Sequence, residues 1–287
     1  MLFCTKNNAQ NKEDITLPIK KNKHKHVGFS EYWYRGKAEI TSYELIQNRY
    51  GELRKGKAVN IFVTEDFLPE KQVKADGLNE NNIPILKLNA TKNFVTGIYP
   101  YSLMTSTFTP TSLLKNAIKI SYSSQEWCGN TYIQLNNREK YQIHLRSYFE
   151  TNSDTDFLLN KVPLENDFWN LLRINPKAIK TGNYKVIPSF EYLALQHKEV
   201  KPYAAVILVI KKKNYLVFSI EYKELDRKLI ISLENKPPYI IESWIENFSK
   251  SGTTYTNSAK RIKTIQSAYW NEKGENGLKY RKELGLY

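Results

Sequence analysis

Apolar and polar residues alternate along most of the chain, beginning near Tyr32. In GKAVNIFVTEDF, at 56–67, Val59, Ile61 and Val63 occupy every second position. A period of two places successive side chains on opposite faces of a β-strand. This pattern predicts about ten strands, at 36–50, 56–67, 83–94, 96–110, within 116–150 (two or three strands), 183–199, 203–210, 215–222, 227–234 and 238–248.

One segment has the spacing of an α-helix instead. In PLENDFWNLLRINP, at 163–176, Leu164, Phe168, Leu171 and Leu172 share one face, because the last three lie four, seven and eight residues after the first. Prolines near both ends and acidic residues in the first turn are typical helix boundaries. The segment is therefore predicted to be helical.

The order of these elements predicts a mainly β protein. The short link KKKN, between 203–210 and 215–222, favours an antiparallel hairpin. We therefore expect an antiparallel sheet, open or partly closed and barrel-like, with one or two short helices. Near the C-terminus, a strand or a short helix is expected at 262–270, followed by an exposed basic tail at 278–287.

The character of the sequence changes near residue 30. Residues 1–29 are polar and rich in Lys and Asn, which is typical of a flexible tether. Residues 30–287 keep the strand pattern without a break, and this continuity predicts a single β-rich domain. A boundary near 155–165, around TNSDTDF and the predicted helix, is the alternative.

Composition narrows the possible partners. The chain has 287 residues, a net charge of +14 and 13% aromatic residues, which suit half-buried sheet surfaces. A basic surface attracts the phosphates of nucleic acids or of anionic lipid headgroups. Because the basic residues are spread along the chain, nucleic acid is not the partner we expect, and its binding stays an alternative. No apolar run reaches the ~18 residues that a transmembrane helix needs.

The N-terminus resembles the end of a bacterial lipoprotein signal, in which LFC precedes a polar tether, TKNNAQNKED. Cys4 would receive the lipid, although most of the apolar part of such a signal does not precede it in this sequence. We expect a membrane-anchored, periplasm-facing envelope lipoprotein, and the alternative is a cytoplasmic protein. The basic run at 20–26, with His24 and His26, suits anionic headgroups. Two histidines alone do not define a metal site, so neither a metal nor a cofactor is predicted.

SQEWCGNTYIQLNNR, at 124–138, contains a candidate for cysteine chemistry. A catalytic cysteine needs a lowered pKa, from a helix N-terminus or a nearby histidine. Cys128 precedes strand-like residues, and His144 would lie across a predicted hairpin. Because free cysteines are commonly buried, we predict that Cys128 packs in the core beside Trp127. Cys128 and His144 remain the candidates of an alternative function, a cysteine-dependent hydrolase.

Three clusters combine aromatic with polar residues, EYWYRGKAE, GIYPYSLMTSTF and SQEWCGNTYIQLNNR. Such mixtures line pockets for amphiphiles or sugars, and they also close the ends of sheets. The clusters predict an amphiphilic or glycan-like ligand that contacts Trp33, Tyr34, Tyr99, Tyr101 and Trp127.

Several of these motifs, from YWYRGKAEITSYELIQNRY through VIPSFEYLALQHKE to RKELGL, carry a resemblance over residues 32–286. The chain resembles a family of predicted bacterial envelope lipoproteins whose members often bear the label septum formation inhibitor Maf. True Maf proteins are α/β nucleotide pyrophosphatases with a Ser-x-Arg-Arg motif, which does not occur here. The resemblance implies an envelope protein and brings no catalytic residues.

The hypothesis that follows is a non-catalytic envelope lipoprotein, acting as a binding or structural module for an amphiphile, a glycan or another envelope protein. No GxGxxG, GxxxxGK[ST], HExxH, CxxC or GxSxG motif occurs in the sequence. The alternative is a hydrolase, either cysteine-dependent or a Maf-type nucleotide pyrophosphatase.

Overall fold

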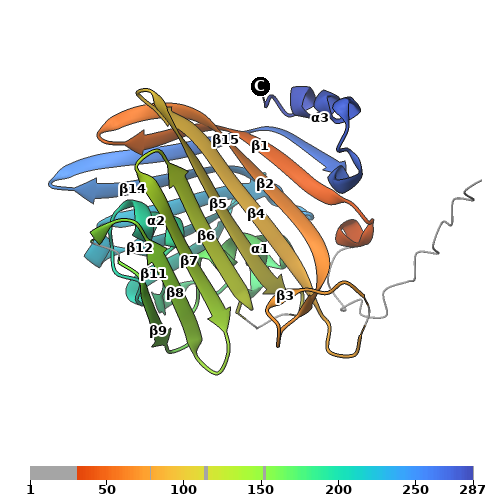
Figure 1. The fold of residues 1–287 in the computed structure, drawn as a ribbon, viewed down its shortest axis with the longest axis horizontal. Coiled ribbons are helices and arrows are strands. Elements are labelled where there is room, and N and C mark those ends of the chain that lie inside the picture. The colour runs from red at the N-terminus through yellow and green to blue at the C-terminus, as the bar shows by residue number, and fades with distance from the viewer. Residues whose placement is uncertain (1–30, 78, 113–115, 151–152, 287) are drawn as a thin grey trace, which may run out of the picture.

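The computed structural model describes residues 31–77, 79–112, 116–150 and 153–286. Within them, fifteen strands form one antiparallel sheet that curves around two helices (Figure 1). The strands are β1 Ala38–Arg49, β2 Glu52–Leu68, β3 Val73–Lys74, β4 Ile83–Thr96, β5 Tyr99–Pro110, β6 Lys119–Glu126, β7 Gly129–Asn137, β8 Tyr141–Ser147, β9 Thr155–Leu159, β10 Gly182–Val186, β11 Tyr203–Lys211, β12 Tyr215–Tyr222, β13 Arg227–Glu234, β14 Ile241–Lys250 and β15 Thr253–Ser267.

The sheet is open. Its order is β10-β11-β12-β13-β14-β15-β1-β2-β4-β5-β6-β7-β8-β9, with β3 beside β2. The first and last strands therefore pair in the middle of the sheet, while β9 and β10 form its two edges. The predicted class, an antiparallel barrel-like sheet that is open or partly closed, is confirmed. The structure has more strands than the predicted number of about ten, because β3, β9 and the first part of β15 are short or polar and lack a clear alternation.

Alternation explains which face each strand buries. Along β13, Leu229, Ile231 and Leu233 are buried, and the residues between them are only partly so. These side chains point to the concave face, where they meet the helices α1 (Glu165–Ile174) and α2 (Phe190–Leu195). The rings of Phe218 and Phe168, for example, lie 5.2 Å apart. Burial of each such side chain stabilises the fold by about 1.5–3 kcal/mol.

Helix α1 confirms the predicted helical segment. Its apolar face buries Phe168 and Leu172 against the sheet. Two polar residues, Asp167 and Asn170, are also buried. Asn170 donates from Nδ2 to the backbone oxygen of Leu86 at 3.0 Å, which joins the helix to β4.

Helix α2 corrects the strand predicted at 183–199. Only its beginning is a strand, β10, and Phe190–Leu195 are helical. The side chain of Ser189 caps the helix by accepting from the backbone N–H of Tyr192 at 3.3 Å. A short helix fills the concavity with Phe190 and Leu193, so tertiary packing overrides the strand-like composition.

The C-terminal part differs from expectation in two ways. Strand β15 includes polar residues from Thr253 onward, because its position between β14 and β1 satisfies its backbone on both sides. The tail forms α3 (Leu278–Glu283), and Leu284 is buried against Ala38, Ile40 and Val63 on the convex face. The tail is thus exposed only in part. No helix in the described part of the chain is long and apolar enough to cross a membrane.

The remaining elements are short 3₁₀ helices that join strands or flank helices. They are η1 Glu31–Tyr34, η3 Pro176–Ala178, η4 Lys223–Leu225, η5 Tyr269–Asn271 and η6 Glu275–Gly277.

Candidate ligand-binding site

The β1–β2 and β14–β15 turns lie at one end of the curved sheet, on the left in Figure 1. A cavity of about 420 Å³ is found at this end. The β1–β2 turn, the β14–β15 turn and the C-terminal end of α2 surround it. We call it the mouth cavity. Its wall combines polar and apolar side chains, among them Arg49, Tyr101, His197, Phe248 and Tyr255. A volume of this size lies in the range of small-molecule sites.

The backbone is strained around the mouth cavity. Tyr50, His197 and Ser251 line it with positive φ angles of 57°, 52° and 51°. They are three of the six non-glycine residues with positive φ in the described chain. Tyr50 begins a two-residue hairpin turn where Asn or Asp is the usual choice, and a bulky residue there is an outlier. Strain of this kind gathers at functional sites, because other contacts hold it in place.

Arg49 lines the mouth cavity and is half-buried. Its Nη1 donates to the backbone oxygen of Leu195 at 3.0 Å, at the end of α2. Its Nε and Nη2 donate to the hydroxyl of Tyr101 at 3.3 and 3.2 Å, and Nη2 also donates to the hydroxyl of Tyr50 at 3.5 Å. The two hydroxyls are 2.8 Å apart. Burial, followed by the hydrogen bond with Tyr50, raises the pKa of Tyr101, so this phenol stays neutral.

The hairpin turns near the mouth cavity expose large apolar side chains. Ile98, in the β4–β5 turn, is 82% exposed, and Trp127, in the β6–β7 turn, is 67% exposed. Exposed apolar residues that gather at one place mark interaction surfaces. We call the exposed apolar residues at this end of the sheet the apolar rim, and they are Tyr50, Leu53, Val95, Ile98, Trp127 and Tyr148. Of these, Tyr50 lines the mouth cavity, and Val95 lines a separate groove beside α3.

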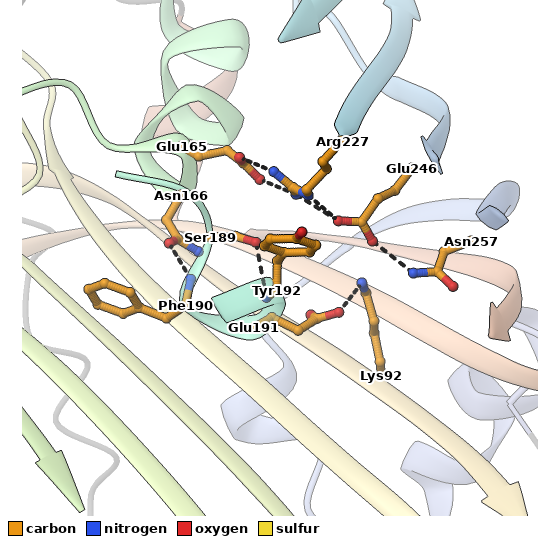
Figure 2. A network of polar contacts seen from close by, with 10 residues as sticks. All are labelled: Lys92, Glu165, Asn166, Ser189, Phe190, Glu191, Tyr192, Arg227, Glu246 and Asn257. Atoms are coloured by element: carbon orange, nitrogen blue, oxygen red, sulfur yellow. Dashed lines mark hydrogen bonds and ion pairs between the residues drawn. The ribbon is translucent and has the colours of Figure 1, made fainter. Parts of the chain in front are cut away.

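A buried network of charges fixes the position of α2 beneath the mouth cavity (Figure 2). Glu191 of α2 pairs with Lys92 of β4 at 2.6 Å. The backbone N–H of Phe190 donates to Oδ1 of Asn166 at 3.2 Å, which joins α2 to α1. These contacts place the carbonyl of Leu195 within reach of Arg49.

Arg227 is the centre of the same network. Its guanidinium pairs with both carboxylate oxygens of Glu165, at 2.6 and 2.7 Å, and with Glu246 at 2.7 Å (Figure 2). Glu246 accepts in turn from Asn257 at 2.8 Å. Burial opposes the ionised form of Glu246, but the charge of Arg227 outweighs it and lowers the pKa of that carboxyl. The ring of Tyr192 lies 4.2 Å from Arg227, so the pair also packs against α2.

The predicted ligand contacts fall into two groups. Tyr101 lines the mouth cavity, and Tyr99 and Trp127 stack beside it with ring centroids 6.1 Å apart. Trp33, in contrast, is only 2% exposed and packs against Phe62, and its neighbour Tyr34 packs against the same core. Tyr101 on β5 lies opposite Phe94 on β4, which lies opposite Gly56 on β2. Phe62 is six residues further along β2 than Gly56, a distance of roughly 20 Å. Trp33 and Tyr34 therefore belong to the core and lie away from the mouth cavity.

The predicted burial of Cys128 is wrong. The residue is exposed in the β6–β7 turn, and its backbone N–H donates to the carboxylate of Glu126 at 2.9 Å. The hydrogen bond and charge of Glu126, together with desolvation, raise the pKa of the Cys128 thiol. That direction is opposite to the one a nucleophilic cysteine needs. The short turn leaves the side chain no neighbouring strand to pack against.

His144 does not approach Cys128. It lies on β8, where its Nδ1 is 2.9 Å from the carboxylate of Asp156 on β9. Its neighbour on β7 is Gln134, whereas the first part of β7, near Cys128, pairs with Ser147. Three residues of β8, about 10 Å, separate Ser147 from His144. The structure therefore keeps the two candidate catalytic residues apart.

Several residues of the mouth cavity have no signal in the sequence that marks them as site residues. Arg49, His197 and Lys250 come from three distant segments, and only the sheet order brings them together. The dipeptides Tyr-Gly at 50–51 and Ser-Gly at 251–252 could have indicated the two hairpin turns. No group of three His, Cys, Asp or Glu residues suited to a metal occurs in the described ranges. Cys4 and the N-terminal tether lie outside them.

The fold and the mouth cavity define a class of protein, an open and strongly curved antiparallel sheet that encloses two helices and carries a cavity at one end. No protein-family model matches the chain, and no curated protein matches it. Among solved structures, it is similar to the β-barrel-like protein of the domain of unknown function DUF1849 from Brucella abortus. The TM-score is 0.48, the sequence identity is 9%, and the match covers 80% of this chain and 97% of that chain.

Proposed function

We propose that this protein is a non-catalytic binding module that holds a small amphiphile in the mouth cavity. The observation that carries the proposal is a cavity lined by both polar and apolar side chains, with the apolar rim exposed on hairpin turns at the same end of the sheet. A ligand with a polar head and an apolar chain satisfies both surfaces. A catalytic alternative has less support, because Cys128 and His144 lie apart and the thiol pKa is raised.

The apolar rim favours an amphiphile over a purely polar glycan. The wall adds Phe149 and Phe248, and the rim adds Ile98 and Trp127. Burial of such side chains beside an apolar chain contributes roughly 25 cal/mol per Å² of apolar surface removed from water. The stacked pair of Tyr99 and Trp127 is the feature that would suit a sugar ring, so a glycan is the second candidate.

We further propose that the module works in the cell envelope, anchored through a lipid on Cys4 as a periplasm-facing lipoprotein. Support comes from the sequence, from the lipoprotein-like context of Cys4 and from the resemblance to envelope lipoproteins. Mass spectrometry of the protein purified from membranes tests this part. An acylated Cys4 is expected, and an unmodified soluble protein would refute it.

A pair of variants tests binding in the mouth cavity. Thr253 lines the cavity, and its neighbour Thr254 does not, although both are exposed. Thr253→Trp places an indole at the cavity and should weaken binding of monolaurin, a neutral single-chain amphiphile, about tenfold, or ~1.4 kcal/mol. Thr254→Trp should leave the affinity within about twofold of the wild type.

The measurement is isothermal titration calorimetry with monolaurin below its aggregation concentration. If neither monolaurin nor laurate binds the wild type, the proposal is refuted. Equal affinity of the wild type and Thr253→Trp would place the site elsewhere. Binding of oligosaccharides, with no binding of either amphiphile, would favour the glycan.

A further inference from the structure

We infer that the ligand of the mouth cavity carries a carboxylate or phosphate group that pairs with the guanidinium of Arg49. The inference rests on the proposed binding function and adds the chemical class of the head group.

Arg49 differs from the other arginines that are at least partly buried. In the described chain, each of these other arginines has a carboxylate partner within 4.0 Å, whereas Arg49 has none. All four hydrogen bonds of Arg49 go to two phenols and a backbone carbonyl, which are neutral. The matched pairs are Arg54 with Glu52, Arg138 with Glu70, Arg173 with Glu39, Arg227 with Glu165 and Arg261 with Glu242.

A guanidinium without a counter-ion in a partly desolvated place favours an anion that enters from solvent. Guanidinium has five N–H donors, and four of them are used by Tyr50, Tyr101 and Leu195. The remaining N–H is on Nη1. Carboxylate and phosphate oxygens form strong charge-assisted hydrogen bonds with such a donor.

The other charged groups of the mouth cavity act in the same direction. Lys250 also lines the mouth cavity. Among the lining residues the one carboxylate is Glu126, which already accepts from the backbone N–H of Cys128. Burial, with the charges of Arg49 and Lys250, lowers the pKa of His197. The electrostatic potential in the mouth cavity is therefore positive, and the pKa of His197 responds to it.

A series of amphiphiles with the same twelve-carbon chain tests the inference on the wild type, so that no variant has to fold. The probes are laurate, dodecyl phosphate, neutral monolaurin and cationic dodecyltrimethylammonium, at about pH 8, where laurate is ionised. Laurate or dodecyl phosphate should bind about tenfold or more tightly than monolaurin, and the cation should bind most weakly. Preference between the two anions distinguishes a carboxylate ligand from a phosphate ligand.

Arg49→Met should remove this preference, so that laurate and dodecyl phosphate bind no more tightly than monolaurin to the same variant. Arg54→Met is the matched control, because Arg54 is also half-buried but does not line the cavity. It should keep the preference for anions. Arg49→Lys keeps the charge without the guanidinium fork and should retain a smaller preference.

The pKa of His197, followed by NMR titration, gives an independent measurement. Bound laurate should raise it, because an anion offsets the charges of Arg49 and Lys250, and bound monolaurin should not. If monolaurin binds as tightly as both anions, or if Arg49→Met keeps the preference, the inference is wrong and the proposed function stands. If no probe binds the wild type, both fail.

Discussion

The buried pair of Glu39 and Arg173 provides the sharpest test of the packing. Nη1 and Nη2 of Arg173 each lie 2.6 Å from a different carboxylate oxygen of Glu39, and both side chains have zero exposure. The Nε of Arg173 also donates to the backbone oxygen of Pro238 at 2.9 Å, and Trp33 and Phe62 flank the guanidinium. Water has no access to the pair.

Arg173→Met removes the counter-ion and leaves the carboxylate of Glu39 buried with the hydroxyl of Tyr32, at 2.7 Å, as its closest donor. Loss of one partner from such a pair costs about 3–5 kcal/mol of the free energy of unfolding. With a slope of roughly 2–3 kcal/mol per molar urea, the unfolding midpoint should fall by about 1–2.5 M. Urea unfolding followed by tryptophan fluorescence measures this shift.

The double variant Glu39→Leu with Arg173→Met removes both charges. It therefore separates the effect of losing the ion pair from the effect of leaving one buried charge without a counter-ion. Because apolar residues of similar size often replace a buried ion pair with little cost, it should be more stable than Arg173→Met alone. A midpoint for Arg173→Met within about 0.3 M of the wild type would refute the burial described here, and so would a double variant less stable than both single ones.

Two further predictions concern single titratable groups. Burial raises the pKa of Asp167 to about 7, although the hydroxyl of Thr109 and the backbone N–H of Ala117 favour its ionised form. In the unfolded chain the carboxyl ionises near its ordinary value of 3.8, so the folded state binds more protons between pH ~4 and ~7. The free energy of unfolding should therefore fall as the pH rises through this window, and Asp167 contributes on the order of 4 kcal/mol to that fall. Asp167→Asn should flatten the dependence of the free energy of unfolding on pH. A profile as steep in Asp167→Asn as in the wild type would contradict it. Cys128 should react with a thiol reagent in native protein within about tenfold of its rate in denaturant, because the turn exposes it. Protection until unfolding would show that the residue is packed after all.

Local pattern in the sequence was sufficient for most elements. Alternation along 227–234 places Leu229, Ile231 and Leu233 on one face, independently of which strands lie on either side. Strand β13 can therefore be predicted from the sequence alone. The spacing of apolar residues near Phe168 determines helix α1 in the same way. An antiparallel, barrel-like sheet, open or partly closed, follows because many short strands joined by short links have few other arrangements. That the sheet is open was decided by the strand order.

Relations between distant residues needed the tertiary structure. Arg173 and Glu39 are 134 residues apart, and nothing in their local sequence indicates that they pair. Helix α2 forms from strand-like residues because the concave space accepts a helix. Cys128 is exposed because it falls in a turn of two residues, a shift too small for sequence patterns to resolve.

The mouth cavity is another feature that depends on relations between distant residues. Its members, including Arg49, His197 and Lys250, meet because the middle of the sheet pairs the first strand with the last, which brings their turns and the end of α2 to one end of the molecule. Most strands could be predicted from the sequence, since side-chain periodicity is local. The set of polar groups that share a cavity depends on the tertiary structure, since strand order depends on burial of the whole concave face at once.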